Sequence, residues 1–327
     1  MHVQWFAHLP GVQLAPGRSS YEVIDGRVTY LYFGEWCELD PSFPESEDKF
    51  NDARPVFYIG EAELEGDLKS VLKQVGERLG RFYLALLLDA RVPLIPDPQL
   101  SVHYVRVNLK AGVATYRLVG PFEREWILYG NRTDYEFDEV AFQALQVAYD
   151  LLPAQGALHE AGYFPGVEAG LETLIRTARP DAWWDQQSVH HVNDFIHCTS
   201  ALENLLVLDS AEEQAPDPVA AFGQHAAALV SPTHSGVAGL AQSYAGLYRL
   251  RTNLLHGQMT MADLSSGDQQ ALRLGRMLLR EVLLKALALN VGRSGSETLA
   301  GLLKRAYEDG TYHEILHEQL RQAEVMA

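Results

Sequence analysis

The sequence predicts an α+β protein in which an N-terminal mixed sheet-and-helix domain (residues 1–160) precedes an all-helical domain (161–327). Two observations predict this division. Short β-branched and aromatic segments separated by turn signals are concentrated in the first part, whereas every segment of the second part has helical periodicity. Between them lies ALHEAGYFPGVEAG (157–170), whose glycines and proline are typical of a linker.

The N-terminal domain is expected to contain strands around two helices. The predicted strands are VQWFAHL (3–9), VTYLYFGEW (28–36), PVFYIGEA (55–62), a hairpin of LSVHYVRVNL (100–109) and VATYRLVGP (113–121), and EREWILYG (123–130). The acidic, proline-containing stretch 40–55 is predicted to be an exposed loop, and the two helices cover 61–90 and 137–154. The strands are rich in aromatic side chains, which form either a sheet core or a stacking face for a ligand: Trp5, Phe6, Tyr30, Tyr32, Phe33, Trp36, Phe57 and Tyr58.

The second domain reads as a series of amphipathic helices. They are predicted over 171–178, 183–208, 218–231, 235–257 and 266–289, with two short helices at 299–309 and 313–322. Asp217-Pro218 and Ser266 are typical helix starts, and Gly257 is a natural stop for the 235–257 helix.

Two of these helices each carry one charge on an apolar face. In YAGLYRLRTNLLHG (244–257), Arg251 lies among Tyr244, Leu247, Tyr248 and Leu255. In HHVNDFIHCTSALENLLVL (190–208), Glu203 lies inside the apolar stripe. Because an unpaired buried charge is costly, these patterns predict an ion pair between Glu203 and Arg251, which is either structural or part of a site. His256 follows at the last helical position, where it either interacts with the helix end or transfers protons.

These residues resemble the Apea-like branch of the HEPN domain family over residues 166–327. The resemblance rests on ALENLL, on YRLRTNLLHG about fifty residues later, and on the helix LRLGRMLLREVLLKAL that follows. It implies a helical bundle that is commonly dimeric, and many members of the family are metal-independent ribonucleases. Their signature, an Arg followed after four to six residues by a His, is matched by Arg251 and His256.

The resemblance implies a homodimeric endoribonuclease effector of a phage-defence or toxin-like system, acting on RNA that includes tRNA as a candidate. His256 would move protons and Arg251 would stabilise the charge of the transition state. Glu203 would orient Arg251, and Asn253 would hold a phosphate oxygen. We expect His197, Thr252 and Tyr248 to contact RNA, and the N-terminal domain to bind the activating trigger.

An alternative is a noncatalytic HEPN module that dimerises or binds nucleotide or RNA. Active family members often carry Asn, Asp or His after the motif arginine, whereas this chain has Thr252 there and Asn253 one step later, which favours the alternative. Arg251 and His256 also lie about 140° apart on a straight helix, so they converge only through a loosened last turn or serve pockets of different protomers.

His190, Asp194 and His197 share a helix face beside Cys198, a pattern that fits a metal site or a polar face lining a dimer cleft. We favour the polar face, because no CxxC or HExxH pattern accompanies it. No metal is therefore expected. No cofactor is expected either, since GVEAG and GRSGSE lack the strand context and lysine of a phosphate loop.

The composition excludes a general polyanion binder. The chain of 327 residues has 43 acidic and 26 basic side chains, a formal net charge of −17, so RNA must bind in a local basic pocket.

Cys37 and Cys198 lie in different predicted domains, which argues against a disulfide and fits a reducing compartment. The sequence lacks a signal-peptide pattern at MHVQWFAHLPG and any apolar run of membrane-spanning length, so we expect a cytoplasmic protein without membrane contact.

Overall fold

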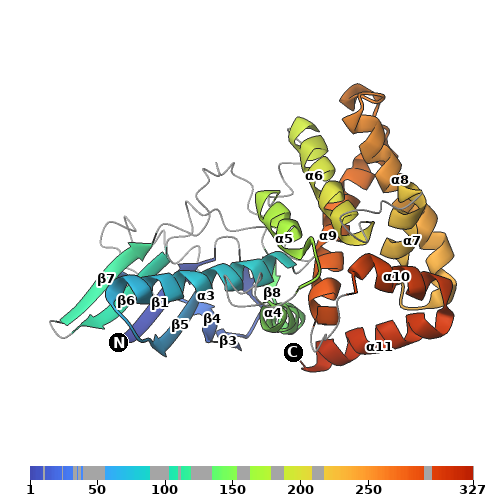
Figure 1. The fold of residues 1–327 in the computed structure, drawn as a ribbon. Coiled ribbons are helices and arrows are strands. Elements are labelled where there is room, and N and C mark those ends of the chain that lie inside the picture. Colours follow the sequence, from blue (N-terminus) through green and yellow to red (C-terminus); the bar gives the residue numbers. More distant parts are fainter. Residues whose placement is uncertain are drawn as a thin grey trace. The chain divides into compact units, whose positions relative to one another are not determined.

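The computed structural model describes residues 1–9, 12–23, 25–31, 35, 38–39, 56–88, 103–109, 112–118, 135–152, 163–177, 188–207, 217–290 and 297–326. The chain divides into two compact units: unit 1 is Met1–Leu86 with Arg91–Tyr149, and unit 2 is Leu87–Ala90 with Asp150–Ala327. The predicted domain boundary at residue 160 lies outside the described residues. A sheet-containing first part and a helical second part are present, as the sequence predicts (Figure 1).

Unit 1 is built on a six-stranded antiparallel sheet of order β3-β4-β5-β1-β6-β7. Its strands are β1 (His2–His8), β3 (Ser20–Val23), β4 (Gly26–Tyr30), β5 (Val56–Glu63), β6 (His103–Leu109) and β7 (Gly112–Leu118). A second, parallel pair joins β2 (Val12–Leu14) to β8 (Tyr135–Phe137). The helices are α3 (Leu68–Leu88) and α4 (Glu139–Leu151), and α3 runs along the large sheet in Figure 1.

The predicted strands at 3–9 and 55–62 and the predicted 100–121 hairpin are confirmed, whereas the predicted start of the first helix at residue 61 is wrong. Glu61 to Glu63 continue β5 and pair with β1, in the register Gln4↔Glu61 and His2↔Glu63. Pairing with a neighbouring strand therefore overrides the helical preference of EAELEG, and α3 begins only at Leu68. The 40–55 loop and the strand expected at 123–130 lie outside the described residues.

The aromatic residues of unit 1 pack as a core on both faces of the sheet. Trp5 and Tyr58 are fully buried, and the Tyr58 ring stacks on Phe82 of α3 with 3.9 Å between ring centroids. Phe6 and Phe57 point to the other face, where they cluster with Leu31, Leu39 and Tyr104. The core interpretation is thus confirmed for four of the aromatic residues. Tyr32, Phe33 and Trp36 lie outside the described residues.

Unit 2 contains helices and no strand within its described residues. The helices are α5 (Val167–Arg176), α6 (Ser188–Leu206), α7 (Pro218–Val230), α8 (His234–Leu255), α9 (Ser266–Asn290), α10 (Leu299–Glu308) and α11 (Gly310–Met326), with a short 3-10 turn η2 (Met261–Asp263). The last helix is longer than the sequence predicted. Helix α7 packs along α8, α6 along α9, and α10 against α7 and α11. Among the described helices, none has the length and apolar character needed to span a bilayer.

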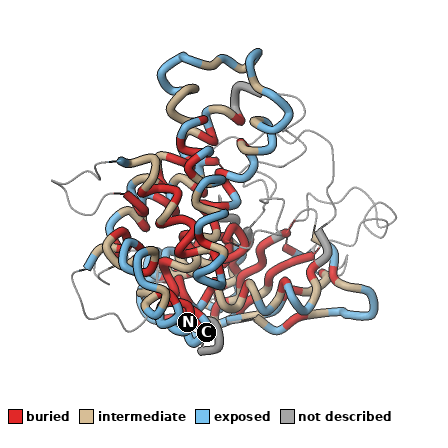
Figure 2. The backbone as a smooth tube through the Cα atoms, turned by 90° about the vertical axis from the view of Figure 1, so that its right-hand side faces the viewer, coloured by how far each residue is buried: buried red, intermediate tan, exposed pale blue. Residues whose placement is uncertain are grey.

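The pairing of α7 with α8 depends on local features of the α7 sequence. Asp217 caps the start of α7 by accepting a hydrogen bond from the Ala220 amide at 3.0 Å, and Pro218 fits the first helical position. At Gly223 the α8 backbone comes so close that a Cβ would lie 2.3 Å from the Ala241 carbonyl oxygen. The glycine therefore sets how closely the two helices approach. Figure 2 shows the buried interior of the bundle and the exposed turn that joins α8 to α9.

The carboxyl end of α7 is satisfied by side chains from two other helices. Lys285 of α9 donates to the Leu229 carbonyl at 3.2 Å, and His317 of α11 lies 3.0 Å from the Ala228 carbonyl. Cations and N–H donors are favourable at this negative end of the helix dipole. Beside them His313 is buried, with its ring 4.4 Å from that of His317 and 5.5 Å from that of His234. Burial, followed by the charges of the two neighbouring imidazoles, lowers the pKa of His313 to about 4.

Candidate functional site

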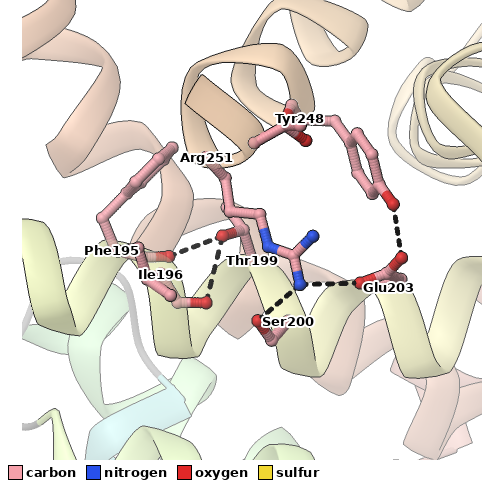
Figure 3. A network of polar contacts seen from close by, with 8 residues as sticks. Phe195, Ile196, Thr199, Ser200, Glu203, Tyr248 and Arg251 are labelled. Carbon is pink, nitrogen blue, oxygen red and sulfur yellow. Dashed lines mark hydrogen bonds and ion pairs between the residues drawn. The ribbon is translucent and has the colours of Figure 1, made fainter. Parts of the chain in front are cut away.

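The predicted ion pair between α6 and α8 is present. A terminal guanidinium nitrogen of Arg251 (Nη2) lies 3.0 Å from a carboxylate oxygen of Glu203 (Oε2), and the two side chains are only 15% and 24% exposed (Figure 3). Both groups extend from otherwise apolar helix faces, as the sequence pattern indicates. Pairing removes the cost of leaving either charge unmatched where the two helices meet.

Tyr248 and Ser200 complete a polar network around this pair. The Tyr248 hydroxyl donates to the second carboxylate oxygen of Glu203, and Arg251 Nη2 also donates to Ser200 Oγ at 3.1 Å (Figure 3). Burial raises the pKa of Tyr248 to about 12, with the Glu203 hydrogen bond and charge acting in the same direction. The phenol therefore stays protonated and serves as a donor. Both carboxylate oxygens of Glu203 are occupied, and this fixes the position of Arg251.

Sequence reasoning missed Ser200, although a signal for it existed. Ser200 precedes Glu203 by three residues, so the two side chains project from the same face of α6. Arg251 uses one nitrogen for both partners, while its Nε is buried and makes no hydrogen bond with any described residue. The Arg251 guanidinium carbon also lies 5.5 Å from the centre of the Tyr248 ring. The arginine is therefore held through Nη2, and its Nε is left without a partner among the described residues of the interior.

The two other residues of this turn that we expected to contact RNA face the protein. Tyr248 is buried, with only 6% of its surface exposed, and its hydroxyl is taken by Glu203. Thr252 is half-buried, and its hydroxyl donates to the Tyr248 carbonyl at 2.9 Å, one turn back along α8. Tyr248 is thus part of the network, whereas the Thr252 hydroxyl is used within α8.

Helix α8 ends in a regular way at His256 and Gly257. The His256 amide still bonds to the Thr252 carbonyl at 3.0 Å, as in an α-helix. Gly257 has φ 68°, and the amides of Gly257 and Gln258 bond back to the carbonyls of Leu254 and Asn253, which is a Schellman end. The predicted glycine stop is confirmed. The alternative of a loosened last turn is wrong, so Arg251 and His256 stay on different faces of α8.

His256 is exposed, whereas Arg251 is turned inward toward α6. Asn253, predicted to hold a phosphate oxygen, is half-buried one turn before His256. The structure thus joins Arg251, Glu203, Tyr248 and Ser200 into one network. It places His256 at the same end of α8 but outside that network.

The polar residues of α6 do not form one accessible face. Asp194 is buried with 5% exposure, while His197, one turn later, is exposed. Cys198 is a free, fully buried thiol whose pKa is raised to about 11 by burial, so it is not a reactive nucleophile. Among the described residues, no three His, Cys, Asp or Glu side chains are grouped so as to hold a metal ion. The side chain of His190 lies outside the described residues.

The arrangement offers two chemical functions at the end of α8. A guanidinium with a fixed orientation and spare N–H groups can bind a phosphate or stabilise developing negative charge. An exposed imidazole can act as a general acid or base toward a bound substrate. A comparison with models of known families, with curated proteins and with solved structures finds no match to this chain.

Proposed function

We propose that the protein is a metal-independent endoribonuclease of the HEPN class, acting as a homodimer at the ends of its α8 helices. The observation that carries the proposal is the network in which Glu203 and Ser200 hold Arg251 on the helix that ends in an exposed His256. Arg251 lies on an apolar helix face and is paired there with a carboxylate of its own. Such an arginine is suited to recognising an anion.

The proposed reaction is a transesterification within the RNA strand. The ribose 2′-oxygen attacks the adjacent phosphorus, its proton passes to one His256, and the bond to the 5′-oxygen breaks as a second histidine protonates it. The products are a 2′,3′-cyclic phosphate and a free 5′-hydroxyl. Because Arg251 and His256 lie on different faces of α8, both sets of groups reach one phosphate only in a cleft between two protomers. There Arg251 would stabilise the phosphorane-like transition state.

In this proposal unit 1 is the sensor. Because the aromatic side chains of its sheet are buried in the core, other parts of the unit would recognise the trigger. Unit 2 would be the effector of a defence or toxin-like response. Substrates would include tRNA and other RNA with unpaired segments.

The test is cleavage of total RNA and of tRNA in the presence of EDTA. His256→Ala should lower the cleavage rate by about 10²-fold or more, as expected for loss of a general acid or base. Gln258→Ala is the matched control, because Gln258 is also exposed in the same turn and should leave the rate unchanged. Product ends should carry a 2′,3′-cyclic phosphate. Cleavage that needs a divalent metal, or that survives in His256→Ala, would refute the proposal.

One observation favours a noncatalytic HEPN module that binds nucleotide or RNA. Arg251 is already engaged by Glu203 and Ser200 and lies on a different face from His256, and the Thr252 hydroxyl is used within α8. A dimer that binds RNA but leaves it uncut, even with infected-cell extract as a source of trigger, would establish this second function.

A further inference from the structure

A second arginine, Arg249, shares the face of α8 on which His256 lies. The two residues are seven positions apart, which on an α-helix places them within about 20° of each other around the axis. Arg249 and Arg251, two positions apart, differ by about 200°. The burial pattern agrees, since Arg249 and His256 are both exposed whereas Arg251 is directed at α6.

Arg249 is also unoccupied, in contrast to Arg251. It makes no hydrogen bond, ion pair or ring contact with any residue that the structure describes. The guanidinium therefore keeps its full set of donors for a ligand, and its exposed side chain can reach along the helix surface.

The segment that contains Arg249 lacks acidic residues, although the chain as a whole is strongly acidic. Residues 218–262, which span α7, α8 and the turn after it, contain no Asp or Glu, whereas the full chain has 43. The next two acidic residues, Asp263 and Asp268, lie beyond the end of α8, where they accept hydrogen bonds from the hydroxyls of Thr260 and Ser265. Glu203 belongs to the opposite side of α8, where it is paired with Arg251. Helices α7 and α8 themselves therefore add no carboxylate that would repel a phosphate at this face.

We propose that Arg249 binds a backbone phosphate of the RNA strand next to the phosphate at His256, so that the exposed face of α8 guides a single strand into the site. This assignment rests on the proposed ribonuclease function and names a substrate-positioning residue for it. Seven residues of helix separate the two Cα atoms by roughly 10 Å along the axis, a gap that the long Arg249 side chain can shorten to reach the phosphate next to the one at His256. Asn253 lies between them on the same side of the helix.

The proposal predicts a change in RNA binding that a purely structural residue would not produce. Each phosphate contact to single-stranded nucleic acid adds about 0.7 to the slope of log affinity against log salt concentration. Losing the Arg249 contact should lower that slope by about 0.7 and weaken binding by about tenfold at low salt. The thermal stability of the fold should stay the same, because Arg249 supports no contact in the described structure.

The experiment measures binding of a fluorescent, unstructured RNA at several salt concentrations to the His256→Ala protein, which leaves the RNA intact. Arg249→Gln in that background should show the smaller slope, and Arg249→Lys should restore most of it. Lys304→Gln is the matched control, because Lys304 is an exposed cation of unit 2, on α10, and removes the same charge.

Two outcomes would overturn the inference: equal slopes for Arg249→Gln and Lys304→Gln, or no RNA binding by the His256→Ala protein. The ribonuclease proposal is tested separately by cleavage. A wild-type protein that binds RNA with an Arg249-dependent slope but cuts none would refute the ribonuclease proposal and support the phosphate contact. Cleavage that depends on His256, together with an unchanged slope in Arg249→Gln, would support the ribonuclease proposal and refute the phosphate contact at Arg249.

Discussion

Acidification should destabilise unit 2 through His313. This imidazole is buried between His317 and His234, and its Nε2 has no hydrogen-bond partner among the described residues. Its pKa in the folded protein is about 4, against 6.5 in an unfolded chain. The folded state therefore binds this proton less readily than the unfolded state does. The resulting stability is fully present above pH 6.5 and is lost as the pH falls toward 4.

The size of the effect follows from these two pKa values. Their difference of about 2.5 corresponds to about 3.4 kcal/mol, of which about 2.5 kcal/mol is lost between pH 7.5 and pH 4.5. The charged groups nearest to His313 act in the same direction, since His317 and His234 are themselves bases. Lys285 adds a further cation at the same end of α7.

The assay is urea unfolding at pH 7.5 and pH 4.5, followed by helical circular dichroism. His313→Leu removes the titrating group from its buried site, so the variant should lose about 2.5 kcal/mol less than the wild type between the two pH values. His197→Leu is the control, because His197 is exposed and should leave the pH dependence of the wild type unchanged. Equal losses in the wild type and in His313→Leu would refute this reasoning. An NMR titration of the His313 ring would confirm the lowered pKa directly.

Three further predictions concern α7, α8 and the contacts that α8 makes with α6 and α7. Tyr248→Phe leaves Glu203 without its hydroxyl donor and should lower the free energy of unfolding by about 1.5 kcal/mol, measured by denaturant titration; no loss would show that water replaces the hydroxyl. Gly223→Ala places a methyl group against the Ala241 carbonyl and should cost about 2 kcal/mol, seen as a lower melting temperature, and an unchanged one would mean that the two helices separate freely. Asp217→Ala removes the cap of α7 and should cost about 1 kcal/mol, whereas Asp217→Asn should retain most of the stability.

The Glu203–Arg251 pair could be predicted because each partner is a single charge on an apolar stripe. A charged side chain on a buried face needs a partner of opposite charge, so the pattern alone narrows the choice of residues that can be that partner. The helix end at Gly257 was predictable for a similar reason, because glycine adopts positive φ at little cost. The three-residue spacing places Ser200 on the same face as Glu203, but a serine on a helix face is compatible with many surroundings, so the spacing alone does not assign it to the network.

The errors in the fold arose where distant segments decide the local structure. The stretch EAELEG has helix-forming residues, yet β1 recruits Glu61 to Glu63 into the sheet. Strand β3, by contrast, was missed for a local reason, because a segment of only four residues gives little periodicity; it pairs with the neighbouring β4 across a tight turn at Asp25, which has φ 61°. The split of Asp194 and His197 between interior and surface depends on where α9 and its neighbours lie against α6, which helical spacing alone does not reveal.

The network at Glu203 also sets the rotational phase of α8. Tyr248 and Arg251 come from the same helix, one turn apart, and both end on the two oxygens of one carboxylate on α6. Rolling α8 by one residue, about 100°, would replace Arg251 with an apolar or neutral neighbour and leave the carboxylate unmatched. An interface made only of apolar side chains would tolerate such a rotation of α8 far better. The Glu203–Arg251 ion pair therefore fixes the rotation of α8 about its axis. Because Arg251 is held toward α6, Arg249 and His256 point to solvent.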